Sequence, residues 1–298
     1  MARASAGRST LSRQLQLLDA FTVDAPFLTL SELARRSGLP VGTAHALLAD
    51  LAEQGLVERG TDRTYRLGVR LWELACRTPG ALGLREIAMP HLQEVHALLG
   101  QHVQLGILSG GDVLFLERLS SRDAVVNATI IGGRLPLHAS AAGLVLLADA
   151  DAATRDEVLA GPLRSITDAT IADAAELRRE LHRVRAQGFA VADGYIHPSA
   201  RGIAVPITGA AGETVASVGA VVPNDEDPWM PLVDALRSTA AGISGALRSA
   251  ALPQSHPEAS PGGRYRTLVN SSQESMQFLA APANRRANAP ERVRAAPR

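Results

Sequence analysis

The sequence lacks lysine altogether and has a single cysteine. All 30 positions counted as lysine or arginine are arginine. This bias indicates a GC-rich genome rather than a function, although arginine is also the better phosphate ligand. Cys76 alone excludes an intramolecular disulfide and any zinc site built from several cysteines. We therefore expect a protein of a reducing compartment.

Long apolar runs and a strong net charge are also missing. No run approaches the ~18 apolar residues of a membrane span, and the N-terminus has no apolar segment typical of a secretion signal. These patterns predict a cytoplasmic protein with no membrane partner. The formal net charge of +0 argues against a purely electrostatic nucleic-acid binder. The charge is uneven, however: residues 1–78 hold ten arginines against eight acids, and residues 253–298 hold seven arginines against three glutamates.

Residues 28–56 are the most informative segment. Their apolar spacing predicts two short helices joined by a tight turn at residues 37–40. Gly38 suits a left-handed helix end, and Pro40 suits the start of the next helix. A β-hairpin pattern follows over residues 56–67. We therefore expect a winged helix-turn-helix domain over residues 9–70, which is a DNA-binding architecture.

The rest of the chain predicts a second domain and a tail. A helical pattern from Leu67 to Arg77, broken by Thr78-Pro79-Gly80, indicates a linker helix and hinge over residues 71–83. Helices flanking an antiparallel sheet are expected over residues 84–250, which makes the fold class α+β. Pro, Ala, Ser, Asn and Arg dominate residues 251–298, and this composition predicts a disordered basic tail. The strands are expected at residues 102–108, 113–119, 189–192, 202–207 and 215–222.

Seven sequence blocks, in order along the chain, carry a resemblance to a known family. They are LTLSELAR at 28–35, SGLP at 37–40, the pairs TA at 43–44 and LL at 47–48, YRLG at 65–68, LPLHASAAG at 135–143, VRAQGFAV at 184–191 and GIAVP at 202–206. On these blocks the chain resembles the IclR family of bacterial transcriptional regulators over about residues 9–247. The resemblance implies a GAF-like effector domain and binding of double-stranded DNA as a homodimer or dimer of dimers. It also implies control by a small molecule, often an organic or aromatic acid.

The candidate DNA contacts lie on the two helices and the hairpin. Short polar side chains on a recognition helix reach base edges, and arginines hold phosphates. Family members often carry Ser and Arg where this chain has Gly42 and Ala46, and losing a bidentate Arg–guanine pair costs roughly 1–3 kcal/mol of discrimination. The alternative is a GAF-like metabolite-binding protein with a weakened or vestigial DNA module. The expected DNA-binding residues are Arg35, Arg36, Gly42, Thr43, His45, Ala46, Arg59 and Arg63.

The candidate effector pocket begins at the small-residue helix that follows His138. Small residues let a ligand approach the N–H groups of a helix start, where an anion is favoured; close helix–sheet packing is the alternative reading. Alignment to the family puts Ala192, Gly202, Gly219 and Val221 where polar residues are common. An apolar pocket disfavours a small, highly charged acid, so we expect an apolar or aromatic effector, oriented by Asp193 or Ser140. The expected lining is Leu105, Ile107, Leu116, Ser140, Ala141, Ala142, Asp193, Gly202, Gly219 and Val221.

An enzyme is not expected. The sequence has no G-x-S-x-G elbow, no phosphate-binding G-x-x-x-x-G-K loop and no H-E-x-x-H pair. His138 and His197 could converge with Asp193 on a metal, but we favour no metal, no cofactor and no catalytic residue.

Overall fold

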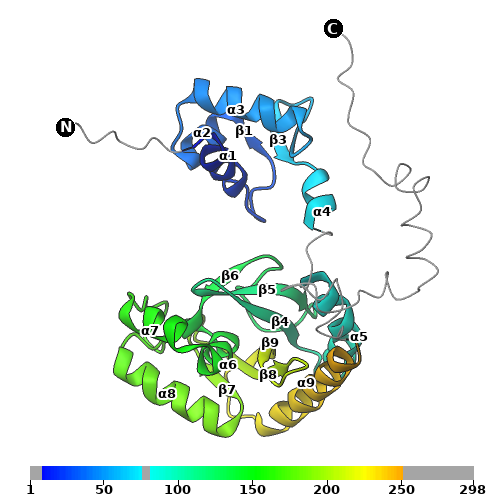
Figure 1. Cartoon of the computed structure of the whole chain (residues 1–298), viewed down its shortest axis with the longest axis vertical. Helices are drawn as coiled ribbons and strands as arrows, with labels where there is room; N and C mark the ends of the chain where they lie inside the picture. The colour runs from blue at the N-terminus through cyan, green and yellow to red at the C-terminus, as the bar shows by residue number, and fades with distance from the viewer. Residues whose placement is uncertain (1–8, 76–80, 251–298) are drawn as a thin grey trace. The chain divides into compact units, whose positions relative to one another are not determined.

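The computed structural model describes residues 9–75 and 81–250, and the chain divides into two compact units between its fourth and fifth helices (Figure 1). The units are described separately below. The tail expected over residues 251–298 lies outside the described residues. No helix in the described ranges has the length and apolar character needed to cross a membrane.

The N-terminal unit packs three helices against a small sheet. Its strands are antiparallel and lie in the order β1-β3-β2. Leu17, Leu33 and Leu48 form the fully buried centre of its core. The elements of this unit are α1 (Thr10–Asp19), β1 (Leu28–Thr29), α2 (Leu30–Ser37), α3 (Val41–Glu53), β2 (Val57–Arg59), β3 (Thr64–Leu67) and α4 (Arg70–Ala75).

Local hydrogen bonds fix the helix-turn-helix. Thr29 caps α2 by accepting from the Glu32 N–H, and the Glu32 carboxylate accepts in return from the Thr29 N–H at 2.8 Å. This capping box lowers the pKa of Glu32, chiefly through the Thr29 hydrogen bonds. Gly38 ends α2 in the left-handed conformation, with φ 68°, as the sequence predicts. The winged helix-turn-helix is therefore confirmed, with β1 as a short third strand that the sequence pattern does not reveal.

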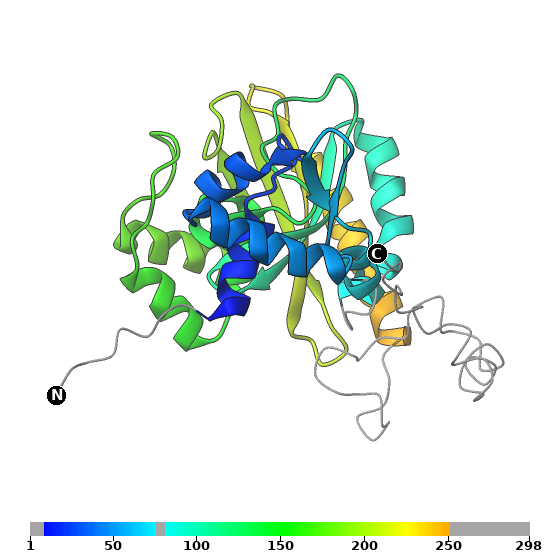
Figure 2. The ribbon, with the colours of Figure 1, turned by 90° about the horizontal axis from the view of Figure 1, so that it is seen from above.

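The C-terminal unit is built on one six-stranded antiparallel sheet with the strand order β6-β5-β4-β9-β8-β7. The sheet separates two helical layers (Figures 1 and 2). The elements are α5 (Ala81–Leu99), β4 (His102–Ser109), β5 (Asp112–Leu119), β6 (Arg134–Pro136), the 3-10 turn η1 (Leu137–Ala139), α6 (Ala141–Asp149), α7 (Ala152–Ala160), α8 (Ala174–Gln187), β7 (Ala190–Asp193), β8 (Ala200–Thr208), β9 (Thr214–Pro223) and α9 (Met230–Ala250).

Each face of this sheet has its own apolar core. Helices α5 and α9 pack on one face, and α6 with α8 behind it packs on the other. Side chains alternate between the faces along each strand, so Leu105 faces α5 and α9, whereas Gln104 faces the α6 side. The expected α+β fold is confirmed. Helix α5 begins at Ala81, so the last three residues of the linker and hinge predicted over residues 71–83 belong to this helix.

Candidate DNA-binding surface and effector pocket

The exposed face of α3 carries small and apolar side chains. Val41, Gly42, His45 and Ala46 are exposed, and Thr43 is partly buried. Pro40 precedes the helix and supplies no side-chain cap. The first N–H groups of α3 are therefore open to an outside acceptor, such as a phosphate. The structure thus brings four expected contact residues, Gly42, Thr43, His45 and Ala46, to one helix end.

The expected phosphate contacts differ in what they touch. Arg35 is exposed in the last turn of α2. Arg36 instead donates to the carbonyl of Ala20 at 3.2 Å, so part of its guanidinium is already engaged within the domain. On the wing, Arg59 stacks on the ring of Tyr65, 5.6 Å from its centroid. Arg63 occupies the hairpin turn with φ 65° and is exposed.

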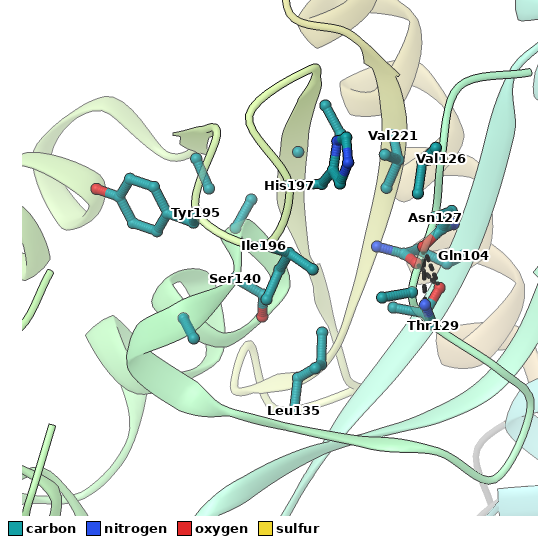
Figure 3. Close-up of a pocket in the computed structure, with 16 residues that line it drawn as sticks. Gln104, Val126, Asn127, Thr129, Leu135, Ser140, Tyr195, Ile196, His197 and Val221 are labelled. Carbon is teal, nitrogen blue, oxygen red and sulfur yellow. Dashed lines mark hydrogen bonds between the residues drawn. The ribbon is translucent and has the colours of Figure 1, made fainter. Parts of the chain in front are cut away.

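A pocket opens on the α6 face of the sheet in the C-terminal unit (Figure 3). It contains about 460 Å³ of space between protein atoms, part of it open to solvent. No acidic residue and no arginine lines it in the described part of the chain. The lining residues are Gln104, Val126, Asn127, Ala128, Thr129, Leu135, Ala139, Ser140, Ala141, Ala192, Tyr195, Ile196, His197, Ala200, Gly202 and Val221.

Strand register places the floor of the pocket. Gly202 is paired with Ala192 on one side and with Val221 on the other. A Cβ built at Gly202 would lie 3.6 Å from the Cβ of Ala141 and 3.8 Å from the Cβ of Ala192. The missing side chain at Gly202 therefore leaves open space between the sheet and the start of α6.

The loop over residues 120–133 forms one wall and is held by buried polar side chains of β4. Gln104 accepts from the Thr129 hydroxyl at 2.8 Å, and its side chain reaches into the pocket (Figure 3). His102 lies within 3.0 Å of the Ser120 hydroxyl through Nδ1 and within 2.6 Å of the Val125 carbonyl through Nε2. Burial lowers the pKa of His102, so the neutral ring donates from Nε2 and accepts at Nδ1.

The opposite wall comes from the β7–β8 loop. The carbonyl of Tyr195 accepts from the Thr170 hydroxyl at 2.6 Å, and the Tyr195 hydroxyl points away from the other labelled side chains (Figure 3). Burial, with Glu180 and Glu176 nearby, raises the pKa of Tyr195 to about 12. His197 is exposed at the rim and lies 2.8 Å from the Ser199 hydroxyl.

The start of α6 faces the same space. Ser140 caps the helix by accepting from the Gly143 N–H at 3.1 Å. The amide nitrogen of Ala141 lies 4.0 Å from the position that a Gly202 Cβ would occupy, so this helix end borders the cavity. Gly143 is required here, because a Cβ would lie 2.1 Å from the Leu137 carbonyl oxygen. Both interpretations of this run of small residues therefore apply: Gly143 allows close packing against Leu137, and Ala141 lies at a helix start that borders the pocket.

The structure brings only part of the expected lining into this pocket. Ser140, Ala141, Gly202 and Val221 line it. Ala142 is buried in the core below α6, and Gly219 sits between Gln104 and Ala204 in the centre of the sheet.

The other expected residues lie on the opposite face of the sheet. Leu105, Ile107 and Leu116 belong to the core under α5 and α9, because alternation along β4 turns Gln104, not Leu105, toward α6. Asp193 does not line the pocket and pairs with Arg201. The polar orienting role predicted for Asp193 therefore finds no support in the lining of this pocket.

Sequence reasoning also missed several lining residues. Three of these residues lie in loops, where no periodicity indicates a site: Asn127, Thr129 and His197. Gln104 lies on a strand that the sequence does predict. The available indication there was a polar residue within the largely apolar strand HVQLGIL. The described residues contain no group of three His, Cys, Asp or Glu side chains placed to hold a metal ion.

Comparison with known sequences assigns both units. Residues 10–60 match the IclR helix-turn-helix domain, and residues 77–245 match the bacterial transcriptional regulator IclR C-terminal domain. The chain belongs to the IclR family of transcriptional regulators. It is a DNA-binding regulator by family, and the family is not one of enzymes.

Two curated relatives illustrate how far the likeness extends in this IclR-family regulator. The HTH-type transcriptional regulator XynR of Escherichia coli K12 is 31% identical over 211 residues, covering 70% of this chain and 84% of XynR. The HTH-type transcriptional regulator BhcR of Paracoccus denitrificans is 33% identical over 219 residues, covering 73% of this chain and 78% of BhcR.

Solved structures agree with this assignment. An IclR homologue from Microbacterium hydrocarbonoxydans, complexed with 4-hydroxybenzoate, is 44% identical with a TM-score of 0.77, covering 81% of this chain and 100% of that one. A transcriptional regulator from Rhodococcus sp. RHA1 is 33% identical with a TM-score of 0.69, covering 82% of this chain and 99% of that one.

Proposed function

We propose that this IclR-family regulator controls promoter binding in response to a small aromatic acid, of the benzoate type, that occupies the pocket between α6 and the sheet. The observation that carries the proposal is the lining itself, which is apolar with neutral polar groups at its edges. The relative that was solved with 4-hydroxybenzoate supports the same ligand class.

The lining favours a flat apolar ligand body. Val221, Leu135 and Ile196 surround the space above Gly202, and an aromatic ring gains binding energy there in proportion to the apolar area it buries. A small dianion would lose its hydration and find no arginine partner in this wall.

A single carboxylate is compatible with the pocket, because the start of α6 borders it. The N–H group of Ala141 at the helix start and the helix dipole favour one negative charge at that point. The Gln104 amide can donate from its nitrogen, since its oxygen is taken by Thr129. At the rim, His197 is available to a polar group at the far end of the ring.

A ligand panel tests this assignment on the full-length protein. We expect 4-hydroxybenzoate and benzoate to raise the unfolding temperature, because a ligand at 100 times its dissociation constant stabilises by about 2.7 kcal/mol. Succinate serves as the small dianionic control. Stabilisation by succinate and not by either benzoate would contradict the proposal.

For the DNA-binding unit, we propose that the start of α3 enters the major groove while Arg35, Arg59 and Arg63 hold phosphates. We also propose a homodimer or a dimer of dimers, because paired winged helices match operators with two-fold symmetry. Exposed apolar side chains on α1 and α4, such as Leu15 and Trp72, supply surface for such pairing. A gel shift on the DNA upstream of its own gene separates this function from that of a metabolite binder with a vestigial DNA module, which would bind no DNA specifically.

A further inference from the structure

The base-reading helix of this protein lacks every side chain that makes a two-point hydrogen bond to a purine. The sequence of α3, VGTAHALLADLAE, contains no Arg, Lys, Asn or Gln. Arg and Lys pair with guanine through two acceptors in the major groove, and Asn and Gln pair with adenine through one donor and one acceptor. Neither pairing is open to α3.

What α3 does present is a row of small apolar groups. Val41 is 52% exposed at the first helical position, and Ala46 is exposed in the second turn of the helix. Gly42 has no atom within 4 Å of where its Cβ would be, so internal packing does not require glycine there. The exposed Val41 side chain offers an apolar contact at this end of the helix. Gly42, which packing does not require, lets a partner surface approach the backbone closely.

The thymine methyl group is the apolar feature of the major groove, and Ala and Thr methyls are the side chains that contact it. We propose that α3 recognises thymine methyl groups through Val41 and Ala46, so that each operator half-site is centred on A·T pairs. This inference rests on the proposed placement of α3 in the major groove.

The polar residues of the same face do not restore a purine code. Thr43 makes single hydrogen bonds to any base, and the exposed His45 ring adds one more contact without a two-point match. Asp50 can accept from a cytosine amino group, but it lies in the C-terminal half of α3, whereas the N-terminal residues of a recognition helix reach base edges. The methyl contacts therefore supply most of the discrimination.

The experiment begins with selection of bound duplexes from random DNA by the full-length protein. In the selected duplex, each thymine is then replaced by deoxyuracil, which removes only the methyl group. We expect two positions per half-site to lose about fourfold in affinity, the factor for one buried methyl-sized group. Placing 5-methylcytosine at those positions, paired with guanine, restores part of the loss because the methyl group returns to the same place in the groove.

A protein variant supplies a second arm. Ala46→Arg is expected to tighten binding and to shift the selected base at one position from thymine to guanine, so that no thymine methyl group is read at that position. Gln54→Arg adds the same charge at the other end of α3 and is expected to tighten binding without changing the selected sequence.

Three results separate the possibilities. Loss of affinity on methyl removal supports the proposal. A selected sequence that is insensitive to deoxyuracil, or one centred on cytosine and dependent on Asp50, overturns it while the DNA-binding function stands. Failure to select any sequence removes the DNA-binding function itself and this inference with it.

Discussion

Two glycines on the same face of the sheet are expected to respond oppositely to an added side chain. At Gly202 the new Cβ of an alanine would meet Ala141 and Ala192 at 3.6 and 3.8 Å, which is ordinary van der Waals contact. At Gly219 it would lie 2.7 Å from the Ile203 carbonyl oxygen. Gly202 therefore lies in the wall of the pocket, whereas Gly219 lies where the backbones of two central strands, β8 and β9, come close together.

The magnitudes follow from these distances. Gly202→Ala is expected to leave stability unchanged or to raise it by about 0.4–1 kcal/mol, because alanine restricts the unfolded chain. Gly219→Ala is expected to cost about 1–3 kcal/mol, since β8 and β9 must separate to admit the methyl group. For a unit of this size, each kcal/mol corresponds to roughly 2–4 °C in the unfolding midpoint.

A larger side chain at Gly202 separates ligand binding from stability. The side chain of Gly202→Leu extends beyond its Cβ into the pocket that Gly202 lines, so the affinity for 4-hydroxybenzoate is expected to fall more than tenfold while the domain stays folded. Gly219→Ala is expected to bind the same ligand with near-normal affinity below its melting point. Thermal unfolding and calorimetric titration measure both effects. Equal destabilisation by the two alanine variants, or full ligand affinity in Gly202→Leu, would refute this account of the pocket.

Three further perturbations test other parts of the structure. Burial lowers the pKa of His102. The stability contributed by its neutral ring is therefore full above pH 6.5 and is lost as the pH falls through the lowered pKa of the folded state. His102→Gln should flatten the pH dependence of the free energy of unfolding in that range. Arg85→Leu leaves the buried carboxylate of Glu117 without its guanidinium partner at 2.6 Å, and chemical denaturation should show a loss of about 3–5 kcal/mol. Arg63→Ala should reduce the salt dependence of DNA binding by about one phosphate contact, and the exposed control Arg178→Ala should not.

Each of these has a contrary result. An unchanged pH profile in His102→Gln would show that the ring does not titrate in the way its burial implies. Stability within 1 kcal/mol of the parent protein in Arg85→Leu would mean that the Glu117 carboxylate does not depend on Arg85 for its stabilisation. Equal salt slopes in the two arginine variants would remove Arg63 from the DNA contact set.

The elements were predictable because their periodicity is local. The hairpin of β4 and β5 lies within one residue of its predicted bounds, since apolar spacing and turn residues mark it directly. Strand β1, with two residues, is too short to show any period. It forms only because Leu28 and Thr29 pair with β3, which is a tertiary contact.

The pocket was harder to predict because the sequence of a strand does not show which of its two faces points toward the ligand-binding side of the sheet. In HVQLGIL both faces of β4 are buried, so alternation predicts two sets of residues but not which set meets the ligand. Choosing Leu105 and Ile107 instead of Gln104 reversed the faces. The loop holding Asn127 and Thr129 has no periodicity, and its position depends on hydrogen bonds to His102 and Gln104 that no local pattern encodes.

The central claim is that occupancy of the pocket and binding of the operator are coupled, and linkage makes this directly measurable. The affinity for 4-hydroxybenzoate should be determined by calorimetry with and without saturating operator duplex, alongside the operator affinity with and without the acid. The account predicts that both ratios depart from one by the same factor, and that Gly202→Leu abolishes the effect of the acid on operator affinity. An acid affinity that is identical with and without operator would contradict it.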